Sequence, residues 1–187
     1  QNKIIEDLKK LKSAISKHLF ARKDLLETTI CLSNIATLKN GYAFQSGKYN
    51  ALGKWKILTI TNVPGERYIN DEDCNCIINL PNDIQDHQVL KEGDILISRS
   101  GTIGKVTYAT KDLAENYIVS DDLVRIRVKD ANLRAYLLAY FTSSTALALM
   151  LLDEYGSVQQ HLQPRHIQEM LIPVPDDWSL AQDMIDA

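Results

Sequence analysis

Long hydrophobic runs are missing from this chain of 187 residues, and none approaches the ~20 apolar residues of a membrane-spanning helix. The N-terminus is charged and periodic rather than apolar, so we expect no signal peptide. Cysteine is scarce too: three residues, an odd number, argue against a disulfide framework and for a reducing compartment, the cytoplasm. Cys74 and Cys76 have only His87 near them, so a zinc site, which needs a second close ligand pair, is not expected.

Glycine is limited to eight residues, yet three of them fall in one stretch, GDILISRSGTIGKV at 93–106. A Walker loop is excluded, because Gly101 and Gly104 are only three apart and Val106 stands where Ser or Thr should follow Lys105. A dinucleotide-binding turn is excluded as well, because the residues after the glycines are β-branched and aromatic and favour a strand over a helix.

The same stretch predicts a hairpin, with arms at 94–98 and 105–109 and a tight turn between them. Its turn carries hydrogen-bond donors suited to phosphates or base edges: Arg99, Ser100, Thr102 and Lys105. A solvated hairpin tip is the plainer interpretation of the same residues, and the stretch alone does not separate the two.

Catalytic motifs are absent. The sequence has no Asn/Asp-Pro-Pro-aromatic loop of an amino-methyltransferase and no Gly-x-Ser-x-Gly elbow of a hydrolase. Asp121 and Asp122, followed by the basic strand LVRIRV, are faintly similar to a nuclease site, but a charged strand entrance explains them with fewer assumptions. We therefore predict neither catalytic residues nor metal ligands.

Charge is unevenly distributed around a net value of −3. Residues 1–23 are mostly basic and residues 66–94 mostly acidic. A protein that touches DNA with a few loops, while partners supply most phosphate contacts, would have this distribution, and so would one that never meets DNA. The length and the 45% apolar content fit one ordinary soluble domain with an appendage.

Hydrophobic periodicity divides the chain into a helix, a strand-rich section and a helical section. Residues 3–23 form an expected helix with an apolar stripe at heptad spacing, made by Ile4, Leu8, Leu11 and Ile15. Short strands separated by turn signals predict a mainly antiparallel unit, with strands at 29–36, 55–61, 76–80, 94–98, 105–109 and 123–128. Helices follow at 133–141 and 145–152, then a short helix from Pro164, and an extended LIPVP segment at 171–175.

Several segments, taken in order, resemble a known family. They are the heptad helix, GYAF at 41–44, GDILISRSGTIGKV, SDDLVRIRV at 120–128, the helix around Tyr136, GSVQQHL at 156–162 and LIPVP. The ordered set resembles the DNA specificity (S) subunit of type I restriction–modification systems over essentially the whole chain.

This resemblance implies about half of an S subunit with an α+β fold. Residues 1–25 would be the end of one conserved helix of coiled-coil type, residues 28–175 a target recognition domain, and residues 176–187 the start of the next conserved helix. The recognition domain would be β-rich and double-β-helix-like, with a C-terminal α-hairpin.

The family further implies a non-catalytic subunit that reads one half of a bipartite target in double-stranded DNA. It would direct modification (methyltransferase) and restriction subunits, and S-adenosylmethionine and ATP would bind to those partners rather than to this chain. The apolar stripe would then pack on the second recognition half or on another copy in a homodimer. A fragment of a fused methylase-nuclease, or an interaction domain that has lost DNA binding, are the alternatives.

The expected DNA-binding face combines the GYAF loop, the turn 99–105 and the loop 157–165. Cations there suit phosphates and guanine, amides suit adenine, and the remaining side chains add short polar contacts. The predicted contact residues are Tyr42, Gln45, Ser46, Lys48, Arg99, Ser100, Thr102, Lys105, Gln159, Gln160, His161 and Arg165. The opposing hypothesis is that Arg99 is bonded internally and that the turn is scaffold.

Overall fold

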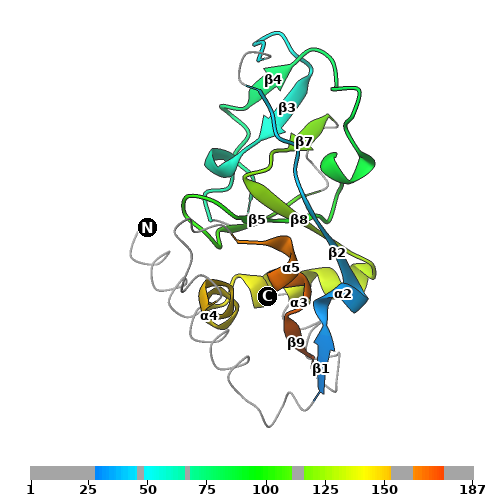
Figure 1. The fold of residues 1–187 in the computed structure, drawn as a ribbon, viewed down its shortest axis with the longest axis vertical. Coiled ribbons are helices and arrows are strands. Elements are labelled where there is room, and N and C mark those ends of the chain that lie inside the picture. Colours follow the sequence, from blue (N-terminus) through cyan, green and yellow to red (C-terminus); the bar gives the residue numbers. More distant parts are fainter. Residues whose placement is uncertain (1–27, 46–48, 66–67, 111–115, 153–161, 175–187) are drawn as a thin grey trace.

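The computed structural model describes residues 28–45, 49–65, 68–110, 116–152 and 162–174 (Figure 1). The predicted heptad helix, with Ile4, Leu8, Leu11 and Ile15, lies outside the described residues, as do the segments 1–25 and 176–187. In the described part of the chain, no helix has both the length and the apolar character needed to cross a membrane.

Among the described residues, short strands form three sheets, with strand orders β2-β8-β5-β6, β4-β3-β7 and β1-β9. The bounds are β1 Thr28–Cys31, β2 Ala36–Asn40, β3 Trp55–Leu58, β4 Asn75–Ile77, β5 Ile95–Ser98, β6 Val106–Tyr108, β7 Tyr117–Val119, β8 Leu123–Val128 and β9 Leu171–Val174. Pairing between these strands is antiparallel apart from the parallel pair β3–β7. The predicted mainly antiparallel unit and the β5–β6 hairpin are thus confirmed.

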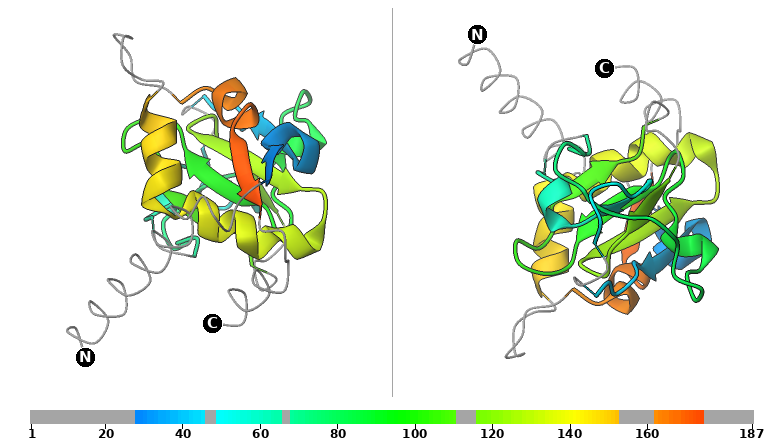
Figure 2. Two further views of the ribbon diagram at one scale, coloured as in Figure 1. Left: turned by 90° about the horizontal axis from the view of Figure 1, so that it is seen from below. Right: turned by 90° about the horizontal axis from the view of Figure 1, so that it is seen from above.

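Helices gather at one end of the molecule, around the β1–β9 pair, while β3 and β4 lie at the other end (Figures 1 and 2). They are α2 Leu32–Ile35, α3 Arg134–Phe141, α4 Ser144–Leu152 and α5 Pro164–Gln168. Pro164 opens α5 in its first turn, as predicted, because a helix start needs no N–H there. The two longer helices, α3 and α4, follow β8 in the chain and contact each other.

Strand β8 separates two parts of the core because its side chains alternate between the two faces of the sheet. Val124 and Ile126 pack in one cluster with the helical residues Tyr140 and Phe141. Leu123 packs in a second cluster with residues of β3 and β7. The four-stranded sheet therefore joins the helical end to the β3–β4 end.

Four local predictions need correction. The expected strand 76–80 ends at Ile77. The expected strand 29–36 ends at Cys31, and α2 and then the start of β2 at Ala36 occupy the rest of the range. The break occurs because Leu32 turns into the core and its N–H donates to the carbonyl of Met170. The expected strand 55–61 stops at Leu58. A 3-10 turn follows at Ile60–Asn62, and the side chain of Asn62 accepts from the N–H of Thr59. Strand β7 was not predicted, although it is fully buried beside β3. The double-β-helix arrangement and the α-hairpin stay predictions.

Candidate nucleic-acid interface

Residues 41–42, the start of the GYAF loop, are hydrogen-bonded to the turn 120–122, which joins β7 to β8 (Figure 1). The N–H of Tyr42 donates to the carbonyl of Val119 at 2.8 Å, and the N–H of Asp121 donates back to the carbonyl of Tyr42 at 3.0 Å. These paired backbone bonds fix residues 41–42 against the turn 120–122.

The turn 99–105 is bonded to the same place. The N–H of Arg99 donates to the carbonyl of Asp122 at 2.9 Å, and the guanidinium of Arg99 donates to the carbonyl of Asp121 at 3.2 Å. Ser100 adds a hydroxyl bond to the Asp122 carboxylate at 2.9 Å. Arg99 and Ser100 therefore act as internal anchors in this structure, which favours the scaffold hypothesis for both residues.

Ser98 is hydrogen-bonded through its side chain to two backbone groups of the turn 99–105. Its side chain is fully buried, accepts from the N–H of Lys105 at 2.9 Å, and donates to the carbonyl of Thr102 at 2.6 Å. Gly101 and Gly104 adopt φ values of 62° and 79°, which side chains disfavour. Of the predicted contact residues in this turn, Thr102 is exposed and Lys105 is half-buried.

We expect Ser98→Ala to destabilise the domain by about 1–3 kcal/mol, because it removes both hydrogen bonds of a fully buried hydroxyl, one from the N–H of Lys105 and one to the carbonyl of Thr102. Urea unfolding of the whole chain measures this. Ser100→Ala is the matched control, since its bond is at a half-buried site and its loss has a smaller effect. Equal midpoints for the two variants would contradict the role given to Ser98.

The loop that ends at Arg165 also reaches the turn 99–105. The N–H of Leu162 donates to the carbonyl of Arg99 at 2.9 Å. Arg165 is exposed on α5, and its Nε lies 3.2 Å from Nε2 of His166. Five predicted contact residues lie outside the described residues: Ser46, Lys48, Gln159, Gln160 and His161. The structure thus brings together three predicted segments through their backbones, around the turn 120–122.

The side chains of the GYAF loop line a separate concavity of about 570 Å³, formed by residues 42–45, 49–50 and 77–82 and here named the tip cleft. The hydroxyl of Tyr42 donates to Asp83 at 2.8 Å, and this bond holds the pKa of Tyr42 above its usual value. Gln45 lines the cleft and is exposed. Tyr49, Asn79 and Asn82 also line the cleft, and sequence reasoning did not single them out. Asparagine is common in plain turns, so the two amides carried no distinguishing signal.

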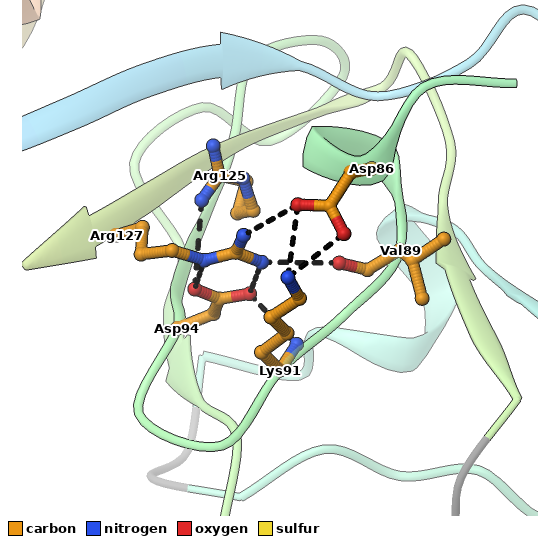
Figure 3. Close-up of polar contacts among 6 residues, drawn as sticks. All are labelled: Asp86, Val89, Lys91, Asp94, Arg125 and Arg127. Carbon is orange, nitrogen blue, oxygen red and sulfur yellow. Dashed lines mark hydrogen bonds and ion pairs between the residues drawn. The ribbon is translucent and has the colours of Figure 1, made fainter.

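Asp94, the acidic residue of the GDILIS strand, is a structural anchor rather than a surface group (Figure 3). It is fully buried and accepts two bonds of 2.8 Å from the guanidinium of Arg127. Arg125, 2% exposed, lies 3.6 Å from the same carboxylate. Burial lowers the pKa of Arg125, while the bond to Asp94 raises the pKa of Arg127. Arg125 therefore belongs to the interior, and Arg127 is half-buried with its guanidinium held by Asp94.

The faint nuclease pattern is accounted for by the same contacts. Asp122 accepts from Ser100, and Arg127 is bonded to Asp94 on the neighbouring strand. Among the described residues, no group of three or more His, Cys, Asp or Glu side chains is arranged to hold a metal ion.

A family model, described as the type I restriction modification DNA specificity domain, matches residues 27–183. This chain belongs to that family. A search of curated proteins with this sequence found no match. The specificity domain is similar to solved structures in fold, and the match in each case covers most of this chain but half or less of the other.

One such structure concerns complex assembly and conformational transition of a type I restriction–modification system, with a TM-score of 0.64, 16% identity, and coverage of 98% of this chain and 47% of that chain. The HsdS subunit from Thermoanaerobacter tengcongensis has a TM-score of 0.61 and 16% identity, and the match covers 98% of this chain and 46% of that chain. The type IIG restriction endonuclease BpuSI has a TM-score of 0.63 and 13% identity, and the match covers 94% of this chain and 28% of that chain. At these identities the likeness shows the fold alone.

Proposed function

We propose that this specificity domain reads one half of a bipartite DNA target and directs the methyltransferase and restriction subunits of a type I system. The family match over residues 27–183 carries this proposal. The chain spans about half the length of the solved type I structures, which fits one recognition half. A fragment of a fused methylase-nuclease is the alternative, and a restriction endonuclease, BpuSI, does share the fold, but the family model favours the specificity subunit.

In this proposal, methyl transfer and DNA cleavage are carried out by the partner subunits. S-adenosylmethionine would bind to the modification subunits and ATP to the restriction subunit, while this chain contributes contacts to DNA. The apolar stripe Ile4, Leu8, Leu11 and Ile15 would pack on the second recognition half or on a second copy.

The proposed DNA contacts start at the outer side of the turn 99–105. Arg99 and Ser100 face inward to their backbone and carboxylate partners, which leaves Thr102 and Lys105 as its outward polar groups. The stem of Lys105 runs past Gly65, where an added methyl group would lie 3.3 Å from Lys105 Cγ. A lysine held in this way suits a phosphate, because phosphate contacts fix position without reading sequence.

We expect Lys105→Ala and Arg165→Ala to weaken binding of cognate and scrambled duplexes alike, and each to reduce the slope of log K against log salt by about 1. Gln159→Ala and Gln160→Ala should instead lower cognate affinity by about 1–3 kcal/mol. A salt-titrated binding assay on the assembled methyltransferase measures both effects. Lys129→Ala is the control cation, because Lys129 bonds to carbonyls of residues 33 and 34. If all four variants bind both duplexes normally, this face is wrong.

A further inference from the structure

The tip cleft contains a fixed aromatic platform. The rings of Tyr42 and Phe44 meet edge to face, with centroids 4.8 Å apart and an interplanar angle of 61°. The bond from Tyr42 to Asp83 holds one ring, and Phe44 packs against the buried β3–β4–β7 cluster. Tyr49 adds a third ring at the rim, with 36% of its surface exposed. Rings held in this way are ready to stack on a flat ligand without first becoming ordered.

Amide groups supply the polar part of the same cleft. Gln45, Asn79 and Asn82 line it and are exposed. Asn50 also lines it, and its side-chain oxygen is already bonded to the N–H of Leu52 at 2.9 Å. Each free amide offers a donor beside an acceptor, the pairing that matches the hydrogen-bonding edge of a nucleobase.

Charge in the cleft disfavours a phosphate. None of the described residues that line it carries a charged side chain, and the carboxylate of Asp83 lies at its margin, bonded to Tyr42. An anionic ligand would meet repulsion there and no cation among those lining residues. The volume of about 570 Å³ falls within the ~300–1,000 Å³ typical of small-ligand sites. The chemistry therefore fits a neutral, planar group with polar edges.

We propose that the tip cleft binds one nucleobase swung out of the target duplex, stacked on the aromatic platform and read by the amides. The inference rests on the proposed function, since DNA supplies the base. Tyr42 links the two sites: its side chain lines the cleft, and its backbone is bonded to the turn 120–122, which also holds the turn 99–105. A duplex seated on the turn 99–105 would meet the cleft in a fixed relation to it.

The test uses the assembled methyltransferase and its cognate duplex. In a series of duplexes, the base on one strand is replaced by an abasic site at each position in turn, which frees the opposite base from pairing. The methyltransferase itself swings out the base that it methylates, so that position is set aside. Because an unpaired base is easier to swing out, we expect binding to tighten by about tenfold or more at one further position. Tyr49→Ala should abolish that tightening and weaken binding of the intact cognate by roughly 5- to 150-fold, the loss of one stacked base.

Tyr68→Ala is the matched control, because Tyr68 is also an exposed tyrosine, at 59%, but does not line the cleft. Circular dichroism checks that both variants are folded. The inference is overturned if binding tightens at no position besides the methylated base, or if the tightening at the further position survives in Tyr49→Ala. A wild-type preference for cognate over scrambled duplex would still leave the proposed function standing. Loss of subunit assembly with normal DNA binding by Tyr49→Ala would also overturn it, in favour of a protein segment in the cleft. Absence of any cognate preference in the wild type removes both.

Discussion

Replacing Asp94 with alanine is expected to lower the free energy of unfolding by about 3–5 kcal/mol, because it leaves a buried cation without its counter-charge. Asp94 is fully buried, and Arg125 beside it is 2% exposed. Arg127 loses both of its 2.8 Å bonds in the same change (Figure 3). The Asp94 carboxylate also accepts from the N–H of Lys91 at 2.8 Å, so a backbone bond at the entrance to β5 is lost too.

Urea unfolding of the whole chain measures this effect through the midpoint at constant slope. Asp86→Ala is the matched control, since Asp86 is 75% exposed and bonds Lys91 at the surface. We expect the control to change stability by less than about 1 kcal/mol. If Asp94→Ala also lost less than about 1 kcal/mol, then water, rather than the Asp94 carboxylate, would be stabilising the charges of Arg125 and Arg127.

Local chemistry predicted the parts of this fold that depend on neighbours in the sequence. The β5–β6 hairpin followed from turn glycines between β-branched runs, and the start of α5 followed from Pro164. Strand β7 was missed because its three residues carry little pattern of their own, and their burial depends on parallel pairing with a strand about sixty residues earlier. The break at α2 was missed for a similar reason, since the partner of Leu32 is Met170.

The candidate interface shows the same limit. The types of residue in GYAF and in the turn 99–105 can be read from the sequence, but their internal partners cannot, and their contacts to DNA stay predictions. The guanidinium of Arg99 bonds to the carbonyl of Asp121, a partner that no local pattern indicates, and Asp94, at a strand start, is fully buried. Asn79 joins Tyr42 in one cleft only because β4 pairs with β3. Such contacts between distant segments are set by the tertiary fold.

Gly41 is the residue on which the placement of the GYAF loop depends most directly. A methyl group at this position would lie 2.1 Å from the carbonyl oxygen of Ser120 and 2.3 Å from that of Val119. Both neighbours are backbone atoms, so no side-chain rotation can make room. The substitution Gly41→Ala must therefore separate residues 41–42 from the turn 120–122 and break the backbone bonds there, including that from the N–H of Gly41 to the carbonyl of Leu123.

We expect Gly41→Ala to destabilise the domain by about 3–5 kcal/mol, from overpacking together with lost backbone hydrogen bonds. Gly65→Ala is the control glycine: its φ of 83° is unfavourable for alanine, but its nearest neighbour is the flexible side chain of Lys105, so about 1 kcal/mol is expected. Urea unfolding compares the two. Where Gly41→Ala remains folded, displacement of Tyr42 should also lower affinity for the cognate duplex, whereas Gly65→Ala should leave Tyr42 in place. Stability of Gly41→Ala within about 1 kcal/mol of wild type would show that the loop tolerates separation from the turn 120–122.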